Sequence, residues 1–102
     1  MDRIEEFQKF IKDRPLDPMP RYALAMELKN RDRLEESIQA FRELIEKFPD
    51  YPAAYYQGAM VLISLKRTDE AKEMLKAGIE AAEKKGDFHT RSEMEDALDS
   101  LD

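Results

Sequence analysis

Few side chains in this 102-residue sequence could do catalytic or metal chemistry. Cysteine is absent and histidine occurs once, as His89, so thiol nucleophiles, thiolate metal sites and histidine relays are excluded. His89 lies near an expected turn, where a solvent-exposed residue is a simpler interpretation than a catalytic one. Glu95 and Asp96 could bind a divalent cation, but neighbouring positions on a helix point in different directions and no glycine-containing calcium loop surrounds them. The sequence therefore predicts no enzyme, no metal site and no cofactor.

The charge is concentrated at one end of the chain. The net charge is −6, and the last eleven residues carry no base and five acids: Glu93, Glu95, Asp96, Asp99 and Asp102. The rest of the chain carries nearly equal numbers of basic and acidic residues. Binding to a phosphate backbone needs clustered Lys and Arg, and no such basic stripe occurs. Nucleic acid is therefore not an expected partner.

Composition favours a single helical domain. Apolar residues make up 42% of the chain, charged residues 39%, and glycine occurs three times, a balance typical of helix-rich proteins. No apolar run approaches the roughly 18 residues of a membrane span, and the acidic N-terminus does not resemble an export leader. We therefore expect a cytoplasmic protein that does not bind membranes.

The helices that are expected to position the side chains of this chain recur with a fixed period. Pro15 and Pro49 are 34 residues apart; Pro15 follows Phe10-Ile11-Lys12-Asp13-Arg14 and Pro49 follows Leu44-Ile45-Glu46-Lys47-Phe48. A fixed period of this length is typical of helical repeats. Between the two prolines, one apolar stripe at helical spacing is interrupted at residues 30–33, and a second begins at Leu34. Asp32 and Glu35 have the spacing of an N-terminal cap for the second helix.

The next period repeats this order from Pro52. Thr68 is expected to cap its second helix, and residues 66–68 form the turn. Residues 60–65 are apolar enough for a buried strand, but no second strand-like segment exists to pair with them, so a helix is expected. Thr90 and Glu93 form a capping box for a last helix. The sequence thus predicts six helices: a leading helix, two complete pairs and a closing helix.

The two periods resemble the tetratricopeptide repeat (TPR) family. The residues that carry the resemblance lie at matching slots. In residues 18–51 they are Arg21, Leu24, Ala25, Leu28, Ser37, Phe41, Leu44 and Pro49. In residues 52–85 they are Tyr55, Gly58, Ala59, Leu62, Ala71, Leu75, Gly78 and Glu83. Some slots depart from the family pattern: Arg21 replaces a large apolar residue, Ser37 an alanine, Gly58 a leucine and Glu83 the closing proline.

The resemblance implies an all-α protein, a short right-handed TPR solenoid like that of small bacterial-type TPR domain proteins. Residues 1–102 would form a single domain. It would comprise a leading half-repeat helix (1–15), repeat 1 (18–51), repeat 2 (52–85) and a C-terminal capping helix (88–102). Because Glu83 replaces the closing proline, the helix before Gly86 is expected to continue to Lys85.

The resemblance also implies a binding surface, because the first helix of each TPR pair lines a concave groove. The corresponding positions are Met19, Tyr22, Met26, Lys29 and Asn30 in the first pair and Ala53, Tyr56, Met60, Ile63 and Ser64 in the second. The partner-binding groove predicted here consists of Tyr22, Met26, Lys29, Tyr56, Gln57, Met60 and Ile63. Aromatic residues and methionines are favoured at binding surfaces, and Lys29 and Gln57 would orient the ligand.

The expected function is a non-enzymatic interaction module that binds another protein, as a peptide segment or a partner helix, in this groove. The alternative is a structural self-association unit, in which the same apolar surface forms a homodimer. The closing helix could also cover it. Family members that clamp chaperone tails use Lys and Asn where this chain has Tyr22 and Met26, so a chaperone tail is not the expected ligand.

Overall fold

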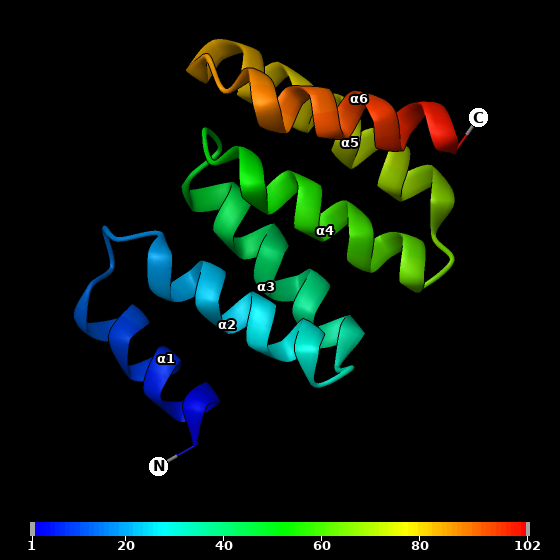
Figure 1. The fold of residues 1–102 in the computed structure, drawn as a ribbon. Coiled ribbons are helices and arrows are strands. Elements are labelled where there is room, and N and C mark those ends of the chain that lie inside the picture. The colour runs from blue at the N-terminus through cyan, green and yellow to red at the C-terminus, as the bar shows by residue number, and fades with distance from the viewer. Residues whose placement is uncertain (1, 102) are drawn as a thin grey trace.

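The computed structural model describes residues 2–101, which form six α-helices. Their bounds are α1 Arg3–Asp13, α2 Met19–Asn30, α3 Leu34–Lys47, α4 Pro52–Ser64, α5 Thr68–Lys85 and α6 Phe88–Ser100. Each helix packs against the next one along the chain (Figure 1). No strand occurs among the described residues; of the ambiguous segment 60–65, residues 60–64 lie in α4 and Leu65 is its C-cap. Within the same residues, no helix is long and apolar enough to cross a membrane.

The helices form two layers that differ in spacing. In one layer α4 contacts both α2 and α6 (Figure 1). In the other layer the backbones of α1, α3 and α5, as far as the structure describes them, do not approach one another. The stack therefore bends toward the first layer. We call the side formed by α2, α4 and α6 the inner face and the opposite side the outer face.

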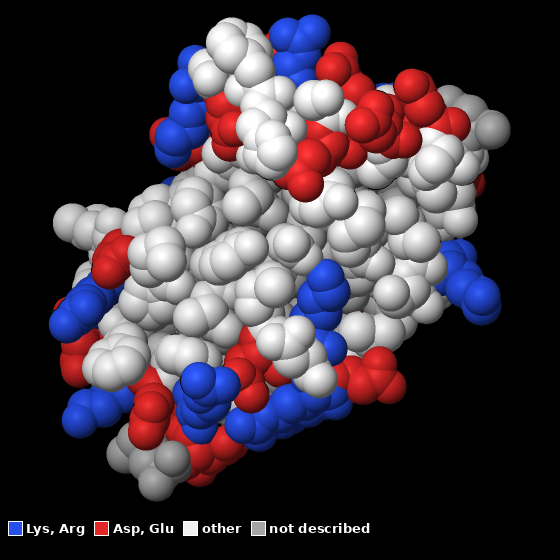
Figure 2. All heavy atoms as spheres, viewed as in Figure 1, with Lys and Arg blue, Asp and Glu red and all other residues white. Residues whose placement is uncertain are grey.

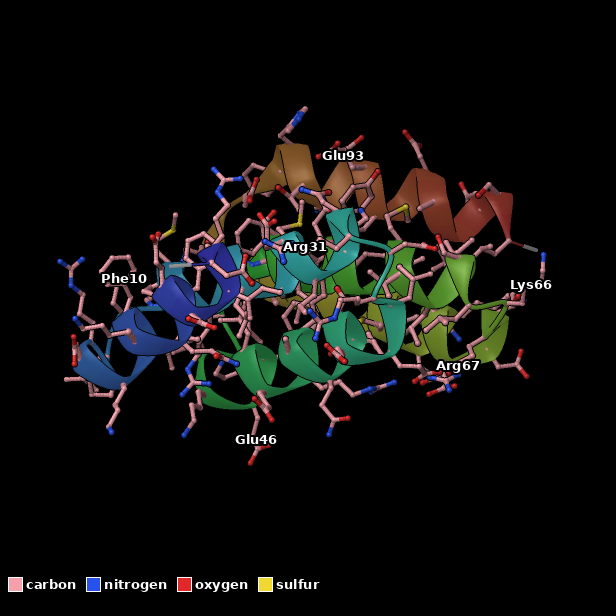
Figure 3. The ribbon with its side chains drawn as sticks, turned by 90° about the horizontal axis from the view of Figure 1, so that it is seen from below. Phe10, Arg31, Glu46, Lys66, Arg67 and Glu93 are labelled. Atoms are coloured by element: carbon pink, nitrogen blue, oxygen red, sulfur yellow. The ribbon has the colours of Figure 1, made fainter. Side chains whose placement is uncertain are left out.

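The turns after α2 and α4 share one backbone conformation. Asp32 and Lys66, 34 residues apart, are left-handed, with φ of 61° and 62°. In both turns the next residue's amide donates to the carbonyl five residues before it, at 2.9 Å. Such bonds satisfy carbonyls that a helix end leaves unpaired. Figure 3 shows Lys66 and Arg67 together at one end of the molecule. The sequence period is therefore repeated in the backbone.

This turn corrects two predicted helix caps. The N-cap residues of α3 and α5 are Arg33 and Arg67, and neither helix has a side-chain cap. Asp32 belongs to the left-handed turn instead, and Thr68 is already the first residue of α5. The left-handed residue brings the two helices of a pair together, and this moves the helix start away from the position that local capping favours.

The junction of α5 and α6 also differs from the prediction in part. α5 ends at Lys85, and its C-cap residue Gly86 has a φ of 77°, as expected for a glycine stop. α6 begins at Phe88, and the Asp87 carboxylate accepts a hydrogen bond from the Thr90 amide at 3.1 Å. Hydrogen bonding from Thr90, first from its side chain and then from its amide, lowers the pKa of Asp87. The predicted capping box of Thr90 and Glu93 is therefore wrong, because Thr90 already lies inside the helix.

The core runs continuously between the layers. Its largest fully buried side chains are Phe41, Leu44, Val61, Leu62, Leu75 and Met94. Small residues such as Ala25, Ala59 and Ala71 are completely buried and allow close helix approach. Ser37, which occupies an alanine slot, is also buried, and its hydroxyl donates to the Ala25 carbonyl at 2.8 Å. This bond satisfies the one polar group that the substitution adds.

An ion-pair network joins the first two helices. The Arg31 guanidinium at the end of α2 lies 2.6 Å from an Asp2 carboxylate oxygen and 2.9 Å from one of Glu27. Figure 3 shows Arg31 beside α1. These hydrogen bonds raise the pKa of Arg31 and lower that of Asp2. Arg31 and Asp2 are 35% and 44% exposed, so their pair orients α1 more than it stabilises it.

The burial of Tyr55 makes the free energy of unfolding decrease at alkaline pH. The Tyr55 hydroxyl donates to the Pro49 carbonyl at 2.6 Å, which ties α4 to the end of α3. Burial, and then the negative charge of Asp50, raise the pKa of Tyr55. The native state therefore holds this proton to higher pH than the unfolded chain does. The stability it contributes is complete below the ordinary tyrosine pKa of about 10 and is lost as pH rises through the raised native value.

We expect Tyr55→Phe to lower the free energy of unfolding by about 1 kcal/mol at neutral pH, because it removes one buried hydrogen bond. The variant should also lose less stability than the wild type between neutral pH and pH of about 11. The decline that remains would reflect Tyr22 and Tyr51, whose pKa values burial also raises. Urea unfolding at both pH values measures the difference. An equally steep decline in both proteins would contradict the assignment.

Candidate functional site

The predicted groove residues lie on the inner face. α2 carries Tyr22 and Met26, and α4 carries Tyr56, Met60 and Ile63; we call these five residues the inner strip. All five are partly buried and pack against the core while part of each side chain remains exposed. Figure 2 shows a broad face of uncharged residues over α2 and α4. The structure therefore brings the two predicted halves of the strip together on adjacent helices.

Aromatic contacts hold the α2 half of the strip in place. The Tyr22 ring packs edge to face against Phe41, with centroids 6.2 Å apart, and against Tyr51, with centroids 5.5 Å apart. Burial raises the pKa of Tyr22. The Tyr51 hydroxyl in turn donates to the sulfur of Met19 at 3.3 Å. Tyr22 is therefore a preorganised surface residue supported directly by the core.

The two polar residues predicted to orient a ligand contact each other. The Lys29 ammonium donates to the Gln57 side-chain oxygen at 2.6 Å, across the boundary between α2 and α4. Burial lowers the pKa of Lys29. An ammonium has three donors and the amide retains its NH₂ group, so each can still reach a second partner. The sequence placed both residues beside the strip, but their mutual bond depends on the register of the two helices.

The closing helix leaves the α2 half of the strip uncovered. α6 packs against α5 and α4, and it does not approach α2 anywhere in the described chain. Its buried side is centred on Met94, and Ala97, Leu98 and Leu101 are partly buried beside it. α6 thus extends the inner face beyond α4, and α2 stays open to solvent (Figures 1 and 2).

The acidic residues of α6 lie at the edge of this face. Glu93, Glu95, Asp96 and Asp99 are on the described part of α6, whereas Asp102 lies outside the described residues. Figure 2 shows acidic side chains gathered over α6, next to the uncharged area. His89 is 87% exposed in the first turn of α6, with its Nε2 3.5 Å from Glu93 Oε1. No group of three or more His, Asp or Glu residues in residues 2–101 is arranged to hold a metal ion.

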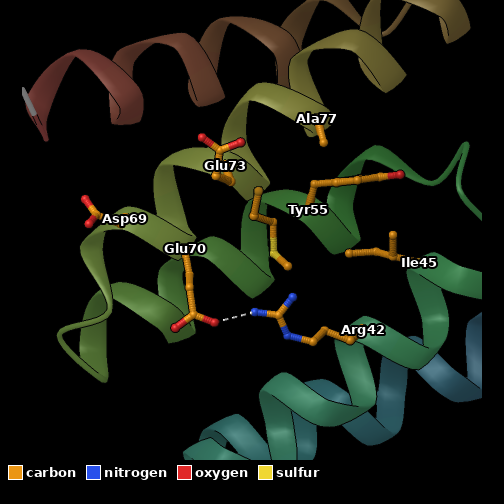
Figure 4. A pocket seen from close by; sticks show the side chains of 8 residues that line it. Arg42, Ile45, Tyr55, Asp69, Glu70, Glu73 and Ala77 are labelled. Atoms are coloured by element: carbon orange, nitrogen blue, oxygen red, sulfur yellow. Dashed lines mark hydrogen bonds and ion pairs between the residues drawn. The ribbon is translucent and has the colours of Figure 1, made fainter.

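The outer face contains hollows that the sequence did not predict. A pocket of about 440 Å³ opens between α3 and α5, with Ile45, Tyr55 and Met74 among its lining residues. An ion pair between Arg42 and Glu70, at 2.9 Å, crosses it (Figure 4). A pocket of about 260 Å³ lies between α1 and α3. Both form where the outer helices spread apart, and neither contains a residue of the inner strip. No local motif marks such a gap, because it arises from the bend of the stack.

The fold matches solved structures closely. A tetratricopeptide repeat domain protein from Salinibacter ruber, solved by NMR, is 38% identical, and the match covers 86% of this chain and 89% of that one, with a TM-score of 0.81. The TPR2B domain of yeast Sti1, solved in complex with pHsp70, is 22% identical. That match covers 96% of this chain and 78% of the Sti1 chain, with a TM-score of 0.88. At this identity the second likeness shows the fold alone, and it confirms the expected all-α repeat solenoid.

Longer curated proteins contain a related segment. The peroxisomal targeting signal receptor of Candida glabrata is 28% identical over 99 residues, which are 97% of this chain and 17% of the receptor. The aspartyl/asparaginyl beta-hydroxylase of Mus musculus is 33% identical over 64 residues, which are 63% of this chain and 9% of the hydroxylase. The chain therefore spans less than a fifth of the length of these relatives.

The tetratricopeptide repeat family model matches residues 30–90, which include most of both predicted repeats. The 34-residue period, the repeated left-handed turns and the alternating layers agree with this match. This chain belongs to the tetratricopeptide repeat family.

Proposed function

We propose that this protein is a non-enzymatic interaction module that binds a peptide segment or partner helix on its inner face. The observation that carries this proposal is the inner strip, a partly exposed apolar surface on two adjacent helices, whose α2 half α6 does not approach. In this proposal the whole chain acts as one domain, with α1 as a leading half-repeat and α6 as a cap.

The chemistry of the strip suits recognition. Tyrosine provides a large contact area at low cost in conformational entropy, and methionine adapts to the shape of its partner. Tyr22 is already held by Phe41 and Tyr51, so little ordering would be needed when a ligand binds. Lys29 and Gln57 would add polar contacts at the seam between the helices.

The relatives support a binding role of this general kind. The Sti1 domain was solved in a complex, and the Candida glabrata relative is a receptor. The ligand that we propose for this chain is inferred from its own groove residues. Tyr22 and Met26 occupy the positions where a chaperone-tail clamp would need Lys and Asn. An apolar segment is therefore the ligand we propose.

The proposal can be tested by selecting random displayed peptides on the immobilised protein. Peptides recovered on the wild type should bind the Met26→Glu, Tyr56→Ala double variant at least about tenfold more weakly, a loss of about 1.4 kcal/mol. The reason is that the variant removes one aromatic anchor and puts a charge in the contact area. Fluorescence anisotropy of labelled peptides measures the loss.

A matched control carries the same kinds of change away from the strip. Leu16→Glu, Phe10→Ala alters two exposed apolar residues, 89% and 41% accessible, in the loop after α1 and on α1 itself. Figure 3 labels Phe10. This control should bind like the wild type, and circular dichroism should show that both variants are folded. Equal peptide binding by all three proteins would refute the inner strip as the site. Sedimentation at two concentrations tests self-association, which would give an apparent mass that rises with concentration in the wild type and not in the strip variant.

A further inference from the structure

The charges around the inner strip are distributed unevenly. Beyond the α4 half of the strip, α6 carries Glu93, Glu95, Asp96 and Asp99. Arg91 lies 3.5 Å from Glu95 and also 3.5 Å from Glu83 on α5, and His89 lies 3.5 Å from Glu93. In the described chain no basic side chain forms an ion pair with Asp96 or Asp99. Among the four described acids of α6 named above, Asp96 and Asp99 are therefore the two that have no basic partner.

Asp96 and Asp99 point away from the core. Both are exposed, whereas the buried Met94 and the partly buried Leu98 face α4 and α5. Residues three apart on a helix are surface neighbours, so the two carboxylates form one negative site. In Figure 2 the acidic side chains of α6 border the uncharged area over α4. A ligand lying across the strip would meet this edge on its α6 side.

The base beside the strip does not balance this charge. The Lys29 ammonium is bonded to Gln57 at 2.6 Å, on the boundary between α2 and α4 and away from α6. Burial lowers the pKa of Lys29, because its surroundings disfavour the charged form. An acidic ligand would thus find one internally bonded ammonium and would be repelled by the carboxylates of α6. A basic ligand would be attracted to them.

We propose that the inner face selects an apolar segment that carries lysine or arginine on the side that lies against α6. This inference rests on the proposed peptide-binding function and specifies its ligand class. Apolar side chains of the ligand cover Tyr56, Met60 and Ile63, and its basic side chains pair with Asp96 and Asp99. The apolar contacts provide most of the affinity, and the charge pairs provide orientation and selectivity that salt screens.

The test uses the peptide selection on three proteins. They are the wild type, the Asp96→Asn, Asp99→Asn variant, and Glu43→Gln, Glu46→Gln as a control. The control removes two charges at the same three-residue spacing from exposed positions on α3. Peptides selected on the wild type and on the control should combine apolar residues with Lys or Arg. Peptides selected on the Asp96→Asn, Asp99→Asn variant should keep the apolar residues and lose the basic enrichment.

A synthetic peptide pair makes the effect quantitative. The best selected peptide is compared with a version in which each Lys or Arg is replaced by Gln. The wild type should prefer the basic version about three- to tenfold at low salt, the range expected for two exposed charge pairs. The preference should shrink at high salt and be absent in the Asp96→Asn, Asp99→Asn variant.

The outcomes separate this inference from the proposed function. If selected peptides depend on Met26 and Tyr56 but show no basic enrichment, the ligand class is wrong and the proposed function stands. A basic enrichment that survives Asp96→Asn, Asp99→Asn would also overturn the inference, because the attraction would come from other acids. If no selected peptide depends on Met26 and Tyr56, the proposed function fails and the ligand class fails with it.

Discussion

Replacing Phe41 by alanine is expected to lower the free energy of unfolding by about 4 kcal/mol. Phe41 is completely buried in α3, between the two layers. Its ring packs against Tyr22, and its Cβ lies 3.4 Å from the position that a Cβ on Gly58 would occupy. Alanine would remove the ring and leave a cavity that these close-packed helices can fill only in part.

A loss of this size is a large share of the 5–15 kcal/mol that typically holds a domain together. Urea unfolding followed by far-ultraviolet circular dichroism measures it. Phe88→Ala is the matched control, because Phe88 is 65% exposed at the start of α6 and its loss should change stability by no more than about 0.5 kcal/mol. Equal stability of the two variants would contradict the central role of Phe41. Because Phe41 supports Tyr22, its variant should also bind strip-dependent peptides more weakly while it is still folded.

Gly78→Ala should destabilise the protein by about 2 kcal/mol, although alanine is normally the better helix former by about 1 kcal/mol. A Cβ at position 78 would lie 2.5 Å from the sulfur of Met94 and 2.5 Å from the Cβ of Tyr55. The methionine sulfur can move, but the Tyr55 Cβ is attached directly to the α4 backbone. The added methyl group would therefore push α5 away from α4 at the point where α6 also packs.

Gly58→Ala is the informative comparison for this prediction. A Cβ at Gly58 would meet the sulfur of Met74 at 2.7 Å, and its next neighbour is Phe41 Cβ at 3.4 Å. A rotamer change of Met74 can relieve the closer contact without moving a helix, and the gain in helix propensity offsets the rest. We expect Gly58→Ala to stay within about 1 kcal/mol of the wild type. Thermal unfolding of both variants checks the difference, and a Gly78→Ala variant as stable as Gly58→Ala would refute the close approach of the helices at Gly78.

The sequence by itself determined the class of fold and the positions of the helices. Apolar residues at helical spacing, such as Leu24, Ala25 and Leu28, and the 34-residue period carry this information locally. The extension of α5 to Lys85 follows from one glycine and one missing proline. The strip residues were also predicted, because α2 and α4 place their inner faces at equivalent repeat positions.

The tertiary structure decided how these helices pack against one another and where two of them begin. Local capping rules favoured Asp32 and Thr68 as helix caps, but the left-handed turns moved both helix starts. The bond between Lys29 and Gln57 depends on the register of two helices 28 residues apart in sequence. The outer pockets depend on the bend of the whole stack.

The local sequence of α6 also does not decide whether this helix covers the strip or extends it. α6 contacts α4 and α5 and leaves α2 open, so its acids border the strip and do not seal it. The physical reason is that helix formation depends on residues within a few turns. Helix register, layer curvature and the neighbours of a surface carboxylate depend instead on packing between segments that the sequence separates by tens of residues.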